Sequence, residues 1–431
     1  MHAAAEKRIK MITKQINISD GVRISYIETD KFKSNFIAVN FVSELDPNKS
    51  FLNSMIPRIL SHASSSYPSQ ADIDRRLQYL YSASLTTKNV SFGQYHIFGF
   101  LSDMLGDKYA LGTNVTDEMV NFLCDIIFNP YLENGIFSEQ FTENEKLEMI
   151  DSIEAEINSK TSYSITRCME NMFDGEIFSV RKTGTVQDVE KITPKMLYDA
   201  YKEALCECGV EIYVVGQVDI DKVADSFKAH FDKIERTPKT IVDIASSPIV
   251  KEIKQICEID DVSQGKLCMG FRLGEANDPV LIALFSELYG GSPTSKLFVN
   301  VREKKSLCYT CRSITSLKTA SMCVVAGIEA TNKEIAEEAI LEQLECVKRA
   351  EITDEELDSA KKSLKNAYLS IYDRPSALAT WSLNRNLSAI DSTPMLEYQS
   401  IDAITKEQIA SFAQKINLDT VYFMRGELEN D

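Results

Sequence analysis

The stretch "ITPKMLYDAYKEALCECGVEIYVVGQVD" (192–219) decides how the chain is organised. Its first half is typical of an N-capped helix, and its second half is an apolar strand that ends at Gly216. The stretch "ITKEQIASFAQKINLDTVYFMRGE" (404–427) follows the same plan: a helix, an Asn-Leu-Asp turn and a strand that ends at Gly426. One helix-strand unit therefore occurs twice in the chain.

A second pair of stretches repeats in the same order. "FIAVNFVSELDPNKSFLNSMIPRIL" (36–60) and "KLCMGFRLGEANDPVLIALFSELYGG" (266–291) each predict a strand, an acidic turn with Asp-Pro and an apolar helix. Two ordered echoes predict a tandem duplication of an α/β unit of about 200 residues. Prolines and mixed polar residues between the copies predict a linker at 237–252, which leaves domains at 12–236 and 253–431.

Composition narrows the class of protein. The 431 residues are 44% hydrophobic and 26% charged, as expected of a soluble globular protein. The formal charge of −17 would repel phosphates, which argues against nucleic acid and fits basic or neutral ligands better. No apolar run approaches the roughly 18 residues of a membrane helix. The first residues carry scattered charges and lack the apolar core of a signal peptide, so we expect a cytoplasmic protein that does not bind a membrane.

The ten cysteines then favour reduced thiols. Cys308 and Cys311 form a C-x-x-C motif, and Cys206 and Cys208 form a C-x-C motif. Four thiolates could hold structural zinc, but the intervals do not match a zinc ribbon. We therefore interpret these cysteines as small buried hydrophobic residues and expect no metal in this chain.

One helix is unusual for its interior residues. In "NSMIPRILSHASSSYPS" (53–69) an apolar helix contains Pro57 and Arg58, and Ser69 caps the next helix. A proline inside a helix removes a backbone donor and clashes with the preceding turn, at a cost of about 3 kcal/mol. Such a helix needs compensation elsewhere.

The doubled order of elements resembles the insulinase/pitrilysin metallopeptidase family, which includes the mitochondrial processing peptidase. The resemblance covers nearly the whole chain. It rests on five stretches, "SSSYPSQADIDRRLQYL", "IIFNPYL", "GTVQDVEKITPKMLYDAY", "IYVVGQVD" and above all "LYGGSPTSKLFVNVREKKSLCYT". It implies an α+β fold with two tandem homologous domains, each a mostly antiparallel sheet with helices on one face. The two domains would face each other across a peptide-holding chamber.

Active members of that family carry H-x-x-E-H on the first helix, where two His bind zinc and the Glu is the general base. Alignment on Tyr67-Pro68 places the motif on 54–58, so Ser54 and Arg58 replace the His and Pro57 replaces the base. On the later long helix, Glu145 matches an acidic family position, and Ser152 replaces the further zinc ligand. The chain has four His, and none of them pair at helical spacing. His62 lies four residues after Arg58 and is expected to be a residue of the helix end.

The second unit keeps the other half of the family's site. Arg302 and Tyr309 have the spacing of the Arg/Tyr pair that the family places opposite zinc, and a glycine-rich loop (Gly290, Gly291, Ser292) precedes them. The resemblance implies that the Tyr hydroxyl donates to the forming oxyanion and that the Arg binds substrate backbone oxygens. The simpler alternative is a surface ion pair of Arg302 with Glu303 and a half-buried tyrosine.

These residues favour the non-catalytic subunit of a two-chain zinc metallopeptidase. We expect such a subunit to be inactive alone and to contain no cofactor, with zinc in a homologous partner that has the motif. It would bind a peptide, possibly a basic one, and supply Arg302 and Tyr309 in a heterodimer, unless the chain instead associates with itself. The alternative is a peptide-binding or structural scaffold without a role in catalysis. A metalloenzyme with cysteine ligands is the least favoured hypothesis.

Overall fold

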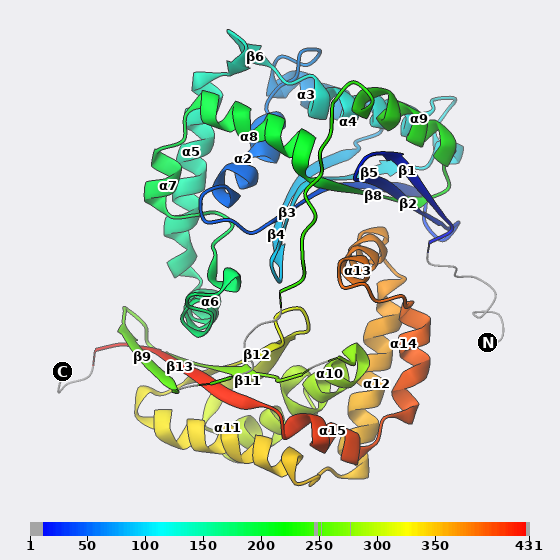
Figure 1. The fold of residues 1–431 in the computed structure, drawn as a ribbon. Helices are drawn as coiled ribbons and strands as arrows, with labels where there is room; N and C mark the ends of the chain where they lie inside the picture. Colours follow the sequence, from blue (N-terminus) through cyan, green and yellow to red (C-terminus); the bar gives the residue numbers. More distant parts are fainter. Residues whose placement is uncertain (1–11, 245–248, 251, 276, 428–431) are drawn as a thin grey trace. The chain divides into compact units, whose positions relative to one another are not determined.

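The computed structural model describes residues 12–244, 249–250, 252–275 and 277–427. Their contacts divide the chain into two compact units (Figure 1). Unit 1 contains the described residues of Met1–Glu154, Val180–Asp243 and Tyr372–Asp391. Unit 2 contains those of Ala155–Ser179, Ile244–Ile371 and Ser392–Asp431.

Unit 1 is built on a six-stranded sheet with the strand order β1-β2-β8-β3-β5-β4. Neighbouring strands are antiparallel except for the parallel pair β2 and β8. β4 and β1 are the two edges. The strands are β1 (Lys14–Ser19), β2 (Val22–Glu28), β3 (Ser34–Glu44), β4 (Ser84–Phe92), β5 (Tyr95–Leu105) and β8 (Gly209–Gly216).

The apolar core of unit 1 lies between one face of this sheet and a layer of helices. Alternate strand residues such as Ile24, Val39, Phe100 and Ile212 face this core and are buried. Figure 1 shows α2, α4, α8 and α9 over that face. The helices of the unit are α2 (Ser50–Leu60), α3 (Gln70–Tyr79), α4 (Val115–Phe128), α5 (Glu139–Glu154), α7 (Val186–Glu190), α8 (Pro194–Glu207), α9 (Ile220–Phe231) and α13 (Pro375–Leu387), and the two short strands β6 (Leu132–Glu133) and β7 (Ile136–Phe137) form a hairpin.

Unit 2 repeats this plan with a five-stranded sheet of order β11-β12-β10-β13-β9. Its one parallel pair, β13 and β9, corresponds to β8 and β2 of unit 1, and its edge strand β11 corresponds to β4. The strands are β9 (Lys254–Ile259), β10 (Gly265–Arg272), β11 (Cys308–Ser316), β12 (Ser321–Ile328) and β13 (Asn417–Arg425). The helices are α6 (Lys160–Met172), α10 (Pro279–Ser286), the π-helical turns η4 (Glu287–Gly291) and η5 (Leu297–Lys304), α11 (Lys333–Lys348), α12 (Asp354–Ile371), α14 (Pro394–Ser400) and α15 (Lys406–Ala413).

The fold class predicted from the sequence is confirmed: two similar α+β units, each with a mostly antiparallel sheet and a helical layer. The repeated stretches 192–219 and 404–427 form α8-β8 and α15-β13, which hold equivalent places in the two units. None of the described helices combines the length and the hydropathy that crossing a bilayer requires.

The two units exchange helices. α6 comes from the N-terminal half of the chain but packs on β10, β12 and β13 of unit 2. α13 comes from the C-terminal half but packs on β3 and β8 of unit 1. The domains expected at 12–236 and 253–431 were continuous, whereas the contacts place 155–179 and 372–391 in the opposite units. The expected linker, 237–252, includes residues 245–248 and 251, which lie outside the described residues.

Candidate functional site

Helix α2 carries the positions that align with the zinc motif. The helix continues through Pro57, and both the backbone amide and the hydroxyl of Ser61 donate to the Pro57 carbonyl, at 3.1 and 2.7 Å. Met55, Ile56 and Ile59 beside the proline are almost completely buried. Each buried aliphatic side chain stabilises the helix by about 1.5–3 kcal/mol, which together exceeds the cost of one interior proline. Packing therefore compensates for Pro57.

Arg58 and His62, one helical turn apart, both bind Glu145 of α5. The Arg58 guanidinium donates from Nε to Glu145 Oε2, and its Nη2 lies 2.9 Å from Glu148 Oε2. His62 Nε2 donates to Glu145 Oε1 at 2.6 Å, and its ring stacks on Phe141. We call Arg58, His62, Glu145 and Glu148 the ion-pair cluster.

The ion-pair cluster fills the coordination capacity of Glu145. Burial favours the protonated carboxyl, but the hydrogen bonds from His62 and Arg58 outweigh burial and hold the pKa of Glu145 below its ordinary value. Both carboxylate oxygens are occupied by donors, and a fixed positive charge lies at the position of the second motif His. This set of residues does not fit a zinc ion. Within the described residues, no three side chains of His, Cys, Asp or Glu gather in a way that could hold a metal.

Ser54, at the first motif position, belongs to a different buried group. Its hydroxyl donates to the Lys182 carbonyl at 2.7 Å and lies 3.1 Å from Asn89 Oδ1. His96 Nε2 donates to the same Asn89 oxygen at 2.8 Å. Burial, aided by Lys182, lowers the pKa of His96 to about 3, so this ring is neutral. Ser152, by contrast, is exposed in the last turn of α5.

In unit 2, Arg302 and Tyr309 line one hollow of about 580 Å³. Arg302 lies in the last turn of η5 with its guanidinium 4.3 Å above the Phe298 ring. No ion pair between Arg302 and Glu303 is found in the described part of the chain. Tyr309 is 68% exposed, which leaves its hydroxyl accessible from solvent.

A β-bulge in β11 sets the direction of Tyr309. The pairing with β12 shifts between Cys308 and Thr310, so Tyr309 is the extra residue. As a result Tyr309 and Thr310 are both exposed, while Cys308 and Cys311 are both buried. The hydrogen bond between the two thiols and the nearby charge of Arg302 lower the pKa of Cys308 despite its burial.

Gly290 and Gly291 are the last two residues of helix η4, and Ser292 follows the helix. The two glycines therefore lie in a helix and not in the expected loop. A Cβ on Gly290 would lie 2.6 Å from the backbone nitrogen of Ser313 in β11. The structure shows that Gly290 admits a strand of its own unit.

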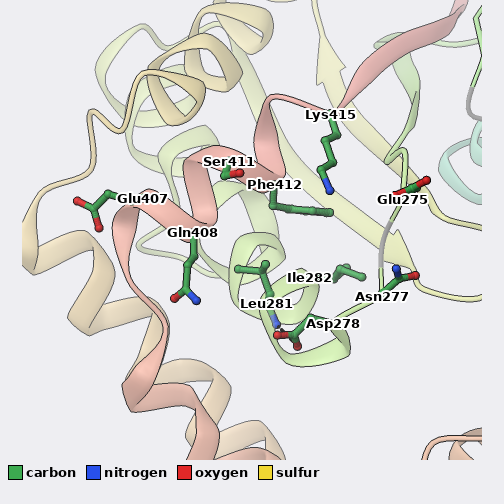
Figure 2. Close-up of a pocket in the computed structure, with 10 residues that line it drawn as sticks. All are labelled: Glu275, Asn277, Asp278, Leu281, Ile282, Glu407, Gln408, Ser411, Phe412 and Lys415. Atoms are coloured by element: carbon green, nitrogen blue, oxygen red, sulfur yellow. Dashed lines mark hydrogen bonds between the residues drawn. The ribbon is translucent and has the colours of Figure 1, made fainter.

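A second hollow in unit 2, of about 440 Å³, contains none of the residues expected from the sequence. Figure 2 shows Leu281 and Ile282 of α10 opposite Phe412 of α15, with carboxylates around them. Asp278 is already engaged as the N-cap of α10, where it accepts from the amides of Val280 and Leu281. The residues that line this hollow are Glu275, Asn277, Asp278, Leu281, Ile282, Glu407, Gln408, Ser411, Phe412 and Lys415.

Comparison with known proteins agrees with this arrangement. Residues 191–364 match the family described as "Peptidase M16 inactive domain". The chain is 29% identical to the "Probable inactive metalloprotease YmfF" of Bacillus subtilis, over 94% of this chain and 96% of that protein. The chain is thus similar to proteins described as inactive members of the M16 peptidase family.

Two solved structures share the fold over almost the full length. A conserved protein from Enterococcus faecalis superposes with a TM-score of 0.89 at 27% identity, covering 97% of this chain and 99% of that one. The M16 inactive domain from Pseudomonas fluorescens superposes with a TM-score of 0.76 at 14% identity, covering 96% and 98%. Both the matched family model and the Bacillus subtilis relative are described as inactive, and at the positions aligned with the zinc motif this chain has Ser54, Pro57 and Arg58.

The sequence singled out individual residues of α2 and α5 but missed how they combine. It identified Arg58, His62 and Glu145 separately and assigned His62 to the helix end. The signal was present, since side chains four residues apart on a helix share one face and can bind the same partner. The buried group of Ser54, Asn89 and His96 was not foreseen, because its members are far apart in the chain.

Proposed function

We propose that this chain is the non-catalytic subunit of a two-chain zinc metallopeptidase. In this proposal a homologous subunit with the H-x-x-E-H motif supplies zinc and the general base. This chain binds the peptide and supplies Arg302 and Tyr309. The observation that carries the proposal is the contrast between the two units: the metal site is replaced by an ion-pair cluster, whereas Arg302 and Tyr309 stay accessible in one hollow.

The chemistry of the pair supports this role. An exposed phenol donor aimed at a developing oxyanion is worth about 3–4 kcal/mol of transition-state stabilisation, and a guanidinium can bind the backbone oxygens of a peptide. Arg302 has no carboxylate partner among the described residues, and the ring of Phe298 supports it. A surface ion pair with Glu303 would have favoured a structural role.

The first test is peptide hydrolysis by this chain alone and mixed with the zinc-motif homologue from the same genome. We expect no cleavage and no stoichiometric zinc by elemental analysis for this chain alone, and cleavage by the mixture. Zinc-dependent cleavage by the purified chain alone would overturn the proposal.

The second test is Tyr309→Phe in the reconstituted pair. We expect turnover to fall about 100-fold or more while assembly, followed by analytical ultracentrifugation, is unchanged. Tyr79→Phe is the matched control, because Tyr79 is also 68% exposed and lies outside the hollow. Full turnover of Tyr309→Phe would favour the alternative, a peptide-binding or structural scaffold without a role in catalysis.

A further inference from the structure

One row of paired residues crosses five strands of the unit 1 sheet. The strand register joins Arg23 to Glu211, Glu211 to Asn40, Asn40 to Gly99, and Gly99 to Lys88. Directly paired residues in a sheet point to the same face. Ile24, Val39 and Ile212 are the sequence neighbours of residues in this row and point into the core under α2, α4, α8 and α9. The row therefore lies on the opposite face of the sheet.

Lys88 reaches across this row from the edge strand β4. Its Nζ donates to Asn40 Oδ1 at 2.9 Å. Asn40 is 1% exposed and donates from Nδ2 to the Glu211 carbonyl at 2.8 Å, which fixes the direction of its side-chain oxygen. The ammonium of Lys88 is thus held in place by a buried, oriented amide.

Gly99 keeps the space between Lys88 and Asn40 free. Its φ is +149°, and a Cβ there would lie 2.0 Å from the Val39 carbonyl oxygen. Only glycine fits this position, because the added atom would meet backbone that cannot move aside. The row therefore has no side chain at Gly99, and the aliphatic part of Lys88 crosses the sheet at this position.

The two cations of the row differ in their partners. Arg23 makes two hydrogen bonds to the Glu211 carboxylate, at 3.1 and 2.8 Å. Lys88 has no carboxylate partner among the described residues, and burial by itself lowers its pKa to about 8. A half-buried ammonium without a counter-charge is unfavourable, and two of its three N–H groups remain available for an anion.

We propose that Lys88 is the anchor of a carboxylate-binding site on the face of the unit 1 sheet that carries this row, at its β4 end beyond the strands β3 and β8 on which α13 packs, and that the carboxylate belongs to a bound peptide. The proposal rests on the peptide-binding part of the proposed function and adds a chemical preference to it. A carboxylate matches the one ammonium in charge, and β4 is an edge strand whose free backbone groups can pair with an extended peptide. The acidic chain as a whole still favours cationic residues elsewhere in the same peptide.

The test uses the full chain and three fluorescent strand-forming peptides of one sequence. All are N-acetylated. The first has a central Glu and an amidated C-terminus, the second has Gln in its place, and the third is the Gln peptide with a free C-terminal carboxylate. Affinities are measured by fluorescence anisotropy for the wild type, Lys88→Met and Lys233→Met. Lys233 is an exposed lysine beyond α9 and serves as the matched control.

We expect a carboxylate-bearing peptide to bind about tenfold more tightly than the amidated Gln peptide, because a charge-assisted hydrogen bond is lost in the latter. This ratio should fall to about one in Lys88→Met and stay unchanged in Lys233→Met. The Glu and free-terminus peptides distinguish a side-chain carboxylate from a C-terminal one. If Lys88→Met keeps the tenfold preference for the carboxylate-bearing peptide, or if the wild type binds all three peptides equally, the carboxylate site is wrong. Peptide binding itself would still stand.

If none of the three peptides binds, peptide binding itself is wrong, and with it that part of the proposed function.

A second experiment measures the reactivity of the Lys88 amine directly, by acetylation with a limiting reagent between about pH 7 and 10 followed by mass spectrometry. Lys88 should react ahead of Lys233, and the preferred peptide should protect Lys88 only. Unchanged reactivity of Lys88 with the peptide bound contradicts the proposal.

Discussion

At the scale of single residues, Arg58 places a permanent charge at the position that aligns with the second His of the zinc motif. A zinc site needs neutral His ligands and gains its stability from the metal, whereas an arginine keeps its charge at any ordinary pH. Glu145 is almost fully buried and requires a cationic partner, which Arg58 and His62 provide. The helix therefore keeps its place against α5 without a metal.

Glu145→Gln should destabilise the protein by about 2 kcal/mol, because it leaves a partly buried guanidinium without its counter-charge. Glu148→Gln is the control: Glu148 is 64% exposed and should change the unfolding free energy by less than about 0.5 kcal/mol. Urea unfolding measures both, and equal effects of the two variants would contradict the account.

The same variant gives a pH signature. The folded pKa of Glu145 lies below its ordinary 4.5, so its contribution is complete above that pH and is lost as the pH falls through the folded pKa. The wild type should therefore lose stability more steeply in acid than Glu145→Gln. Parallel acid profiles of the two proteins would be evidence against this contribution.

At the scale of elements, one edge strand of each sheet carries a residue on which the proposals rest. β4 holds Lys88 and β11 holds Tyr309, and the two strands occupy equivalent positions in the duplicated sheets. A regular strand would turn Tyr309 and Thr310 to opposite faces, and the bulge turns both outward. The middle of β11 lies against η4, which approaches it closely between Gly290 and Ser313.

Gly290→Ala should therefore destabilise unit 2 by about 2 kcal/mol, since the new methyl group would meet the Ser313 backbone nitrogen at 2.6 Å. Gly209→Ala is the control, because its added Cβ meets only one atom, at an ordinary distance of 3.9 Å. Thermal unfolding of both variants measures the difference. A Gly290→Ala protein as stable as the wild type would mean that η4 can shift away from β11.

At the scale of the whole molecule, each unit depends on a helix from the other half of the chain. Arg272 of β10 shows how closely the segment around α6 joins unit 2. Its guanidinium binds Asp419 at 3.0 Å, Glu176 at 2.8 Å and the Met172 carbonyl at 2.5 Å, and lies over the Phe173 ring. A buried arginine left without these partners would cost about 3–5 kcal/mol.

The halves 12–236 and 253–431, expressed separately, should therefore fail to fold, because the second lacks 155–179 and the first lacks 372–391. Co-expression of the two halves should restore a folded complex. Circular dichroism and size-exclusion chromatography of each half and of the pair test this. A monomeric, cooperatively unfolding half would show that the exchanged helix is dispensable for it.

The sequence by itself determined the duplication, the α+β class and most of the elements. Ser69 caps α3 as expected, and the repeated stretches 192–219 and 404–427 form α8-β8 and α15-β13. These features depend on periodicity and capping, which act between residues close in the chain. The absence of a helical His pair was equally a matter of local spacing, and it sufficed to predict an inactive family member.

Only the tertiary structure decided which distant residues meet. The pairing of His62 with Glu145, the row from Arg23 to Lys88 and the exchange of α6 and α13 all join segments far apart in the chain. A residue's type limits the partners it can take, but register and helix docking choose among them. That choice is made by burial and shape across the whole unit, and local pattern carries no record of it.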